Sequence, residues 1–311
     1  MNDKTGMTPN NDIKNRLTGE TVSFASIILK GLGQIMLQEN AVTGLLFLIG
    51  IFYGSFTMGA AALLAVVCGT TTALLLKYEK SEIDKGFYGF SAALVGVAAI
   101  LFLKPVLISW IIIILGSALA SLLQHLFIKR KIPVFTLPFV LVTWLILFFA
   151  NNFFTSILPE PSVGASITDN FTFAIKGFGQ VIFQDSLVSG LLFFIAVFIS
   201  SPISALYGLA GAILSAVVAF KLSAPASDIS LGLFSYNAVL CAIVFAGNQI
   251  KDGFWVLIAV LLSLSISFLM LKFNITQLTF PFVLASCITL LFRKYLGKSI
   301  QKETINQNTQ H

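Results

Sequence analysis

Long apolar segments, separated by short polar or charged turns, run along most of this chain. Most of them approach the roughly 20 residues that a helix needs to cross a bilayer. None shows the alternation of apolar and polar positions that is typical of a transmembrane barrel strand. The pattern therefore predicts an all-α polytopic membrane protein with six apolar helices in each half. The predicted segments are 22–38, 41–55, 57–76, 86–103, 106–128 and 132–150, followed by 168–184, 187–200, 203–220, 232–248, 253–271 and 275–292.

Segment length sets how many of these helices can cross the membrane. Segments 41–55 and 187–200 are short for a full crossing. We expect about five crossings in each half, together with one pore helix that penetrates only half of the membrane. A first helix broken at its glycines is the other possibility. The sequence does not decide which segment penetrates half-way.

Composition agrees with a membrane protein, and the polar stretches set its boundaries. Of the 311 residues, 57% are hydrophobic and 10% are charged, against about 45–50% apolar and about 25% charged in soluble proteins. The polar start of the chain lacks an apolar stretch followed by a small-residue cleavage site, so we expect no removable signal. The predicted parts are a polar tail (1–21), a first transmembrane repeat (22–150), an external linker (151–167), a second repeat (168–292) and a basic tail (293–311).

The two halves repeat polar residues as well as apolar ones. Residues 31–49 align with residues 177–195 and match them at ten of nineteen positions. An amide or carboxyl group that is buried without a partner is costly, so these residues should face a cavity, a polar neighbour or the aqueous boundary. They could instead satisfy backbone groups that are freed where glycines break the helix. The repeated polar pairs are Gln34 with Gln180, Gln38 with Gln184, and Glu39 with Asp185.

A second motif recurs at the same offset, in residues 86–94 and 232–240. It aligns Phe90 with Tyr236 and Leu94 with Leu240. Residues four positions apart share one face of a helix, so each copy places a ring beside an aliphatic side chain. Such a pair is either an ordinary packing contact or one wall of a slot, and the small and polar neighbours favour the slot.

A third motif recurs in residues 134–139 and 277–282, at a slightly shorter offset than the first two. Each copy contains Thr-x-Pro-Phe. Proline removes a helical hydrogen bond and bends the helix, so we expect polar backbone at membrane depth beside Thr136 and Thr279. The two hydroxyls could equally bond back to their own helices.

Basic residues indicate how the halves are oriented. If both tails lie inside, the basic loops 77–85 and 129–131 also fall inside, after two and four crossings, as the positive-inside rule requires. The stretch 151–170 then lies outside, and it carries Glu160 and Asp169 but no base. An odd number of crossings in each half inverts the second half relative to the first. The sequence therefore predicts two inverted repeats.

Taken together and in order, these duplicated motifs resemble the urea transporter family over residues 24–292. The motifs are Gly-x-Gly-Gln with a following Ser/Thr-Gly-Leu-Leu, then Gly-x-aromatic-x-aromatic-x-Ala-x-Leu, then Thr-x-Pro-Phe. The resemblance implies a passive, channel-like facilitator of urea with a pore at the interface of the repeats. It also implies a homotrimer in which each protomer encloses its own pore.

The resemblance also implies the roles of individual residues in a narrow urea filter. Oxygen acceptors line one wall, a flat slot excludes non-planar solutes, and hydroxyls lie near the centre. Leu37 stands where the family commonly has an aromatic residue, and Tyr236 carries a hydroxyl where phenylalanine is common. The filter could thus be wider on one side and admit methylated ureas or small amides. The implied residues are Gln34 and Gln180 as acceptors, Phe90, Leu94, Tyr236, Leu240, Leu37 and Phe183 as the slot, and Thr136 and Thr279 as the hydroxyls.

Other functions find less support. An ion-coupled secondary transporter would need buried ionisable groups, and only Glu39 and Asp185 lie near the motifs. A channel for ammonia or another small neutral solute stays an alternative, although the paired histidines typical of ammonia pores are missing from the sequence. An enzyme is not expected, because the sequence has no HExxH, GxSxG or phosphate-loop motif.

The remaining features point to a protein without cofactors in a lipid bilayer. Cys68, Cys241 and Cys287 lie in apolar contexts without metal-ligand spacing, so we expect small buried side chains and no metal or cofactor. The basic residues, with an isoelectric point near 9.2, cluster at loop ends and not along a helix face, which argues against nucleic acid as a partner. We expect a bacterial inner membrane with both termini in the cytoplasm.

Overall fold

The computed structural model of this protein describes residues 23–133, 135–159 and 172–308, with side chains as far as residue 296. All secondary structure in these ranges is helical, and every one of the twelve apolar segments contains a helix. The prediction of an all-α fold is therefore confirmed. The first half consists of α2 (Phe24–Gly33), the 3-10 helix η1 (Gln34–Met36), α3 (Ala41–Gly54), α4 (Phe56–Leu75), α5 (Lys80–Asp84), α6 (Phe90–Phe102), α7 (Leu107–Lys129), α8 (Leu137–Phe153) and the 3-10 helix η2 (Thr155–Ile157).

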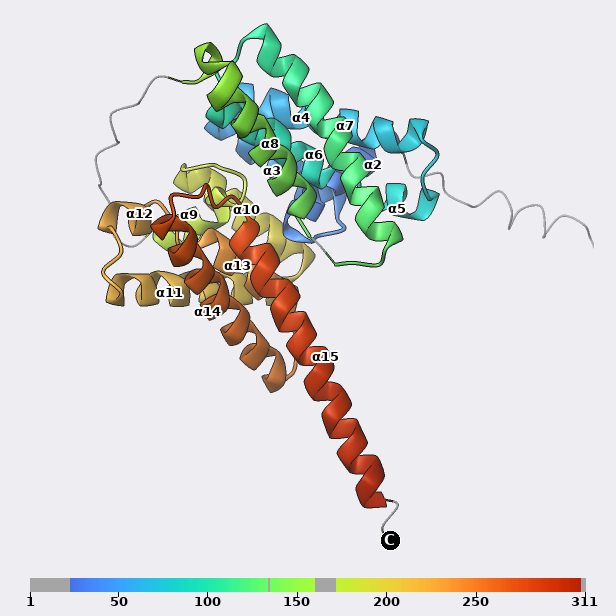
Figure 1. Cartoon of the computed structure of the whole chain (residues 1–311), viewed down its shortest axis with the longest axis vertical. Helices are drawn as coiled ribbons and strands as arrows, with labels where there is room; N and C mark the ends of the chain where they lie inside the picture. The colour runs from blue at the N-terminus through green and yellow to red at the C-terminus, as the bar shows by residue number, and fades with distance from the viewer. Residues whose placement is uncertain (1–22, 134, 160–171, 309–311) are drawn as a thin grey trace, which may run out of the picture.

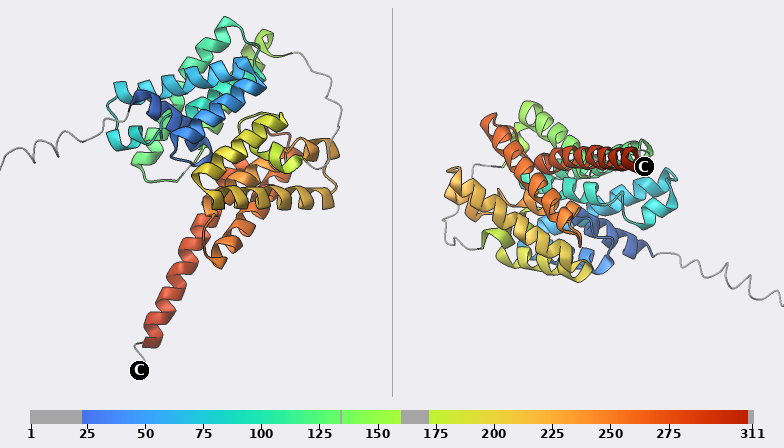
Figure 2. Two further views of the ribbon diagram at one scale, coloured as in Figure 1. Left: turned by 180° about the vertical axis from the view of Figure 1, so that it is seen from behind. Right: turned by 90° about the horizontal axis from the view of Figure 1, so that it is seen from below.

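The second half forms a second bundle that packs against the first (Figures 1 and 2). Its last helix continues beyond the bundle (Figure 1). The short helices α5 and α12 lie in loops for which the hydrophobic pattern predicts no element. The helices of this half are α9 (Phe173–Gln180), α10 (Leu187–Ser200), α11 (Pro202–Lys221), α12 (Ala226–Ser230), α13 (Tyr236–Phe245), α14 (Ile250–Lys272) and α15 (Phe280–Asn308).

The two halves share their backbone in register. Helices α3, α4, α5 and α6 precede α10, α11, α12 and α13 by the offset of the first two motifs, and α7 and α8 precede α14 and α15 by the shorter offset of the third. Left-handed backbone conformations, which are uncommon for residues with a side chain, recur at the same offsets. They occur at Leu37 and Phe183, with φ of 61° and 57°, and at Phe135 and Leu278, with φ of 47° and 46°. The repeat in the sequence is therefore a repeat of the fold.

Helices α3 and α10 form the centre of the contact between the halves (Figure 1). The rings of Phe47 and Phe193 meet edge to face with their centroids 5.2 Å apart. The Thr43 hydroxyl donates to the Ala196 carbonyl at 2.8 Å, and the Ser189 hydroxyl donates to the Gly50 carbonyl at 2.8 Å. These six residues form three equivalent pairs at the offset of the first two motifs, namely Thr43 and Ser189, Phe47 and Phe193, and Gly50 and Ala196. The contact is reciprocal, as in a two-fold interface between identical surfaces.

A sharp break separates α2 and η1 from α3, whose axis is bent by 77° relative to theirs. The chain can turn back here because α3 approaches α2 through a glycine. A Cβ atom on Gly44 would lie 1.7 Å from the Leu29 carbonyl oxygen, and a Cβ atom on the equivalent Gly190 would lie 2.3 Å from the Ile175 carbonyl oxygen. The expectation of a first helix broken near its glycines agrees with this geometry.

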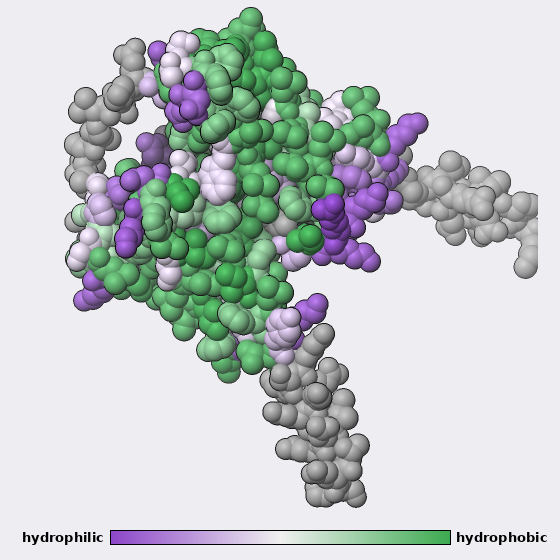
Figure 3. Space-filling view, viewed as in Figure 1, coloured by the Kyte–Doolittle hydropathy of each residue, from purple (hydrophilic) through white to green (hydrophobic). Residues whose placement is uncertain are grey.

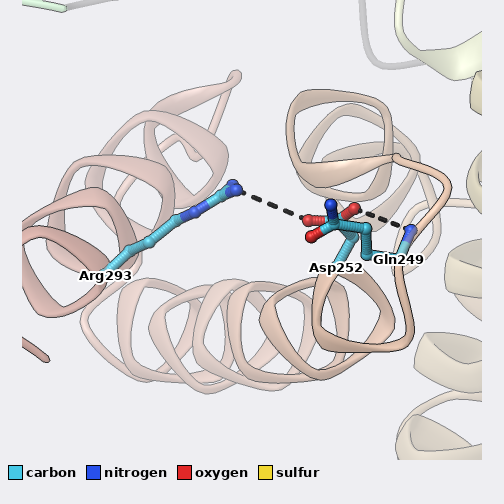
Figure 4. Close-up of polar contacts among 3 residues, drawn as sticks. All are labelled: Gln249, Asp252 and Arg293. Atoms are coloured by element: carbon cyan, nitrogen blue, oxygen red, sulfur yellow. Dashed lines mark hydrogen bonds and ion pairs between the residues drawn. The ribbon is translucent and has the colours of Figure 1, made fainter. Parts of the chain in front are cut away.

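Polar side chains fix the start of the long helix α14 in the second half. The Asp252 carboxylate accepts from the Gln249 backbone N–H at 3.1 Å and from the Arg293 guanidinium at 3.4 Å (Figure 4). It thus satisfies a free N–H at the helix start and joins α14 to α15. Ser109 holds the equivalent position in α7, and its hydroxyl donates to the Lys104 carbonyl at 2.7 Å.

The face of the two bundles that Figure 3 shows is largely apolar, as a surface in contact with lipid should be. Large side chains such as Phe56, Leu75 and Leu107 are more than three-quarters exposed. Within the described ranges, four helices, α4, α7, α11 and α14, are long and apolar enough to span a membrane, and the bent pair of α2–η1 with α3 could provide a fifth span. The chain is a polytopic membrane protein, whereas five crossings in each half stay a prediction.

We expect Gly44→Ala to destabilise the folded protein by about 1–3 kcal/mol, because the new methyl group would overlap a backbone oxygen that cannot rotate away. Thermal unfolding of the purified protein in detergent measures the change. Gly253→Ala is a matched control, because the nearest atom to its added Cβ is the Tyr207 hydroxyl oxygen at 3.5 Å. Equal melting temperatures for the two variants would contradict the close approach of α2 and α3.

Candidate functional site

Two cavities reach into the protein beside the contact between its halves. The first, which we name the Gln34 cavity, has a volume of about 220 Å³, and the second, the Gln180 cavity, has a volume of about 570 Å³. The Gln34 cavity is lined by Gln34, Ile35, Leu37, Phe87, Phe90, Gln124, Ile128, Ile132, Pro133, Phe135, Thr136 and Phe282. The Gln180 cavity is lined by Gly54, Ser55, Met58, Leu101, Phe102, Gln180, Phe183, Gln184, Asp185, Leu231, Leu233, Tyr236, Leu271, Ile275, Thr276, Gln277 and Leu278.

The two cavities are equivalent places in the two halves. Each contains a glutamine at the end of the broken first helix, the residue three positions later, and a ring at the start of the helix that carries the second motif. Because these residues occupy equivalent positions in the two halves, the two cavities are equivalent parts of the repeated fold. The equivalent wall residues are Gln34 and Gln180, Leu37 and Phe183, Phe87 and Leu233, Phe90 and Tyr236, Ile128 and Leu271, Ile132 and Ile275, and Phe135 and Leu278.

A pair of threonine hydroxyls lies beside both cavities. The Oγ1 atoms of Thr136 and Thr279 are 2.6 Å apart and hydrogen-bonded, and both side chains are buried. Thr136 lines the Gln34 cavity, and Leu278, next to Thr279 in the chain, lines the Gln180 cavity. We name this hydrogen-bonded pair the threonine junction. The junction directly joins equivalent residues of the two copies of the third motif.

The sequence allowed these threonines to bond back to their own helices, and the structure shows that they bond to each other. The expected bend at proline is also wrong. Pro138 and Pro281 stand in the first turn of α8 and α15, where a helix has no hydrogen bond for proline to remove. The polar backbone near the junction comes from the non-helical residues just before these helices.

Gln34 and Gln180, the two glutamines that the family resemblance implies as acceptors, differ in how they are held. The Gln34 side chain donates from Nε2 to the Lys85 carbonyl at 3.1 Å, which fixes the plane of its carboxamide. The Gln180 carboxamide makes no hydrogen bond within the part of the chain that the structure describes. Both side chains are half-buried and lie on a cavity wall. Each therefore has an amide oxygen free for a solute.

The hydroxyl of Tyr236 has a structural use. It donates to the Leu278 carbonyl at 2.7 Å, and the neighbouring Asn237 accepts from the Phe282 backbone N–H at 3.2 Å. These bonds tie α13 to the backbone on either side of Thr279. In the first half Ser91 replaces the asparagine, and its buried hydroxyl finds no partner among the described residues. The junction is thus braced more firmly from the second half.

The predicted slot residues divide into two groups. Phe90 and Tyr236 lie on cavity walls with 7% and 9% of their surface exposed, and Leu37 and Phe183 line the same cavities. Leu94 and Leu240 are fully buried in the core and line neither cavity. The structure therefore does not place these two leucines where the resemblance implies a slot wall, because they lie one turn further into their helices.

Of the other repeated polar residues, Gln38 and Gln184 bond to nearby backbone, and Gln184 and Asp185 also line the Gln180 cavity. Gln38 donates to the Met36 carbonyl at 2.9 Å, and Gln184 donates to the Ile182 carbonyl at 3.1 Å. This geometry favours the alternative that these residues satisfy the break after the first helix. Glu39 is exposed and lies 3.6 Å from the Lys30 ammonium group, and Asp185 is an exposed residue at the edge of the Gln180 cavity.

The cavities also contain residues that the sequence analysis did not select. Phe87, Phe135 and Phe282 are rings within the repeated motifs, but only Phe282 recurs as a ring, at Phe139, whereas leucines hold the positions equivalent to Phe87 and Phe135. Recurrence was therefore a usable signal for Phe282 alone. Gln124 and Gln277 carried no such signal, because residues of other types hold the equivalent positions. The three cysteines are free. Cys241 is buried as expected, whereas Cys68 and Cys287 are only half-buried.

Comparison with known proteins matches this chain to one family. A sequence model described as urea transporter matches residues 25–294. Urea transporter 1 of Rattus norvegicus is 32% identical over 245 residues, which cover 73% of this chain and 64% of the rat protein. Urea transporter 1 of Ovis aries is 27% identical over 298 residues, which cover 88% of this chain and 78% of the sheep protein. The chain thus spans less than two thirds of the length of the rat relative.

We expect Thr136→Val to lower the free energy of unfolding by about 1–2 kcal/mol, because it leaves the buried Thr279 hydroxyl without a partner. Thr279→Val should have a similar effect. The double variant should cost less than the sum of the two single variants, since it removes both hydroxyls together. A double-mutant cycle of thermal unfolding in detergent measures this coupling, and additive effects would mean that the two hydroxyls do not interact.

Proposed function

The chain belongs to the urea transporter family, a family of transporters and channels and not of enzymes, and we propose that it conducts urea passively across a membrane. The proposed route runs through the Gln34 cavity, the threonine junction and the Gln180 cavity. The observation that carries the proposal is the position of the junction beside two equivalent cavities from the two halves. This arrangement supplies a path with the same kinds of residues at each end.

The chemistry of the walls suits urea. Urea is planar and neutral, and its two NH2 groups need acceptors in place of water. In this proposal Gln34 and Gln180 supply amide oxygens, and the Thr136 and Thr279 hydroxyls both donate and accept at the centre. Several weak sites in series allow a solute to leave as easily as it arrives. Ions would lose far more hydration than these groups could replace.

Rings supply the flat surfaces of the proposed slot. Phe90 and Leu37 face the Gln34 cavity, and Tyr236 and Phe183 face the Gln180 cavity. Phe183 is itself held by rings, since its centroid lies 6.4 Å from that of Phe102 and 6.1 Å from that of Phe139. We propose that Leu94 and Leu240 support the slot from the core behind it.

The threonine junction must open for urea to pass. With the two oxygen atoms 2.6 Å apart, no solute fits between them. Each hydroxyl can exchange its bond to the other threonine for a bond to urea, so that opening does not leave a buried group unpaired. In this proposal the bond between the threonines closes an empty pore, and urea replaces it during passage.

The reciprocal contacts support an inverted repeat with a two-fold axis in the membrane plane. Thr43 and Ser189 exchange equivalent bonds between the halves, and the threonine junction pairs equivalent residues. We propose that the halves run in opposite directions across the membrane. The homotrimer, the bacterial inner membrane and the cytoplasmic termini that the sequence analysis expects stay predictions.

Ion coupling is less well supported than passive passage. Glu39 is paired with Lys30 at the surface, and Asp185 is exposed. Asp252 is a buried carboxylate, but it is neutralised by Arg293 and caps α14 without lining either cavity (Figure 4). These three carboxylates therefore do not form a buried relay for protons or sodium along the proposed route.

We expect Gln180→Met to lower urea flux roughly tenfold, because the variant keeps the side-chain length and loses one acceptor along the route. Stopped-flow measurement of urea flux into proteoliposomes gives the rate. Ser117→Ala is a matched control, because the Ser117 hydroxyl bonds to its own helix and lines neither cavity. A folded Gln180→Met protein with the wild-type rate would remove Gln180 from the route.

Transport should end at equal urea concentrations on both sides of the membrane. We therefore expect an imposed proton or sodium gradient to leave the final distribution of radiolabelled urea in proteoliposomes unchanged. Accumulation above equilibrium would identify a coupled transporter and would contradict the passive mechanism.

A further inference from the structure

Each cavity contains one carboxamide that has no equivalent carboxamide in the other half. Gln124 lies on α7 and lines the Gln34 cavity, and only 7% of its surface is exposed. Its Oε1 atom is buried, and its carboxamide makes no hydrogen bond to any residue for which the structure gives a position. The equivalent residue on α14 is Ser267, which lines neither cavity. A buried carboxamide without partners is a costly group that calls for an explanation.

The surroundings of Gln124 hold it in place. The next residue, His125, stacks on the ring of Tyr78 with centroids 3.6 Å apart, and its Nδ1 lies 3.0 Å from the Tyr88 hydroxyl. These contacts fix the end of α7 against the segment that leads into Phe90. Gln124 therefore sits on a braced helix, on the same cavity wall as Gln34 and Thr136.

The Gln180 cavity has its own unpaired carboxamide from a different position. Gln277 is the first residue of the second copy of the third motif, and its buried Oε1 has no partner within the described ranges. Its equivalent position in the first half is residue 134, a valine. The two unpaired carboxamides thus arise at non-equivalent positions, so duplication of the chain does not account for them.

We propose that Gln124 and Gln277 are additional urea contacts, one in each cavity, outside the residues that the family resemblance implies. A carboxamide and urea each carry a C=O beside an N–H, so the two can pair through two antiparallel hydrogen bonds. Each glutamine would hold a urea molecule beside the filter glutamine of its cavity. Because the two carboxamides come from different elements, the two ends of the route bind urea differently. This inference rests on the proposed function.

The test compares Gln124→Met with the wild-type protein in proteoliposomes over a range of urea concentrations. Methionine keeps the length of the side chain and removes both hydrogen-bonding groups. We expect the half-saturating urea concentration to rise roughly three- to ten-fold. The melting temperature in detergent should not fall, because the glutamine has no protein partner to lose. A purely structural role would instead lower the melting temperature and leave the half-saturating concentration unchanged.

Ser121→Ala is the matched control, since Ser121 lies one turn earlier on α7, has a buried hydroxyl with no partner in the described part of the chain, and lines neither cavity. It should leave the half-saturating concentration unchanged. Gln277→Met should raise it as Gln124→Met does. Wild-type flux equal to that of empty liposomes would refute the proposed function itself. Two results would overturn this inference and leave the proposed function standing. One is wild-type flux that rises linearly with urea concentration, and the other is an equal half-saturating concentration in the wild-type protein and in Gln124→Met.

Discussion

A polar backbone group at membrane depth must find its partner within the protein, and the interior of this molecule is organised around that requirement. The first helix of each half is broken, and Gln38 and Gln184 bind carbonyl groups at the two breaks. Hydroxyls of Thr43 and Ser189 bind carbonyl groups of the opposite half. The bonds of Thr43 and Ser189 cross between the halves. Pairing of polar backbone groups therefore both stabilises the broken helices and fixes the two halves against each other.

The contact between α3 and α10 determines where the cavities can form. Reciprocal packing of Phe47 against Phe193 brings equivalent residues of the two halves together. The threonine junction is a second contact between equivalent residues, and the two cavities lie beside it. A route along the interface therefore meets the same kinds of residues in reverse order, which suits a solute that moves in either direction down its gradient.

Much of the fold could be predicted from the sequence, because membrane helices are recognised by the length and hydrophobicity of their segments. The two constant offsets between the repeated motifs also predicted which residues would be equivalent, and the helix starts follow them from α3 and α10 onward. Contacts across the interface could not be predicted, since neither periodicity nor a repeat says which faces of the halves meet. The bond between Thr136 and Thr279 and the complete burial of Leu94 and Leu240 are of this kind. Gln124 could not be predicted from the repeats, because Ser267 and not a glutamine stands at the equivalent position.

If urea passes between Thr136 and Thr279, a reversible cross-link between these two positions should block its passage. Both threonines are replaced by cysteine in a chain whose Cys68, Cys241 and Cys287 are replaced by alanine, and urea flux is measured before and after oxidation. We expect the disulfide to abolish flux above the liposome background and a reductant to restore it. Unchanged flux in protein that mass spectrometry shows to be cross-linked between residues 136 and 279 would contradict passage between the two threonines.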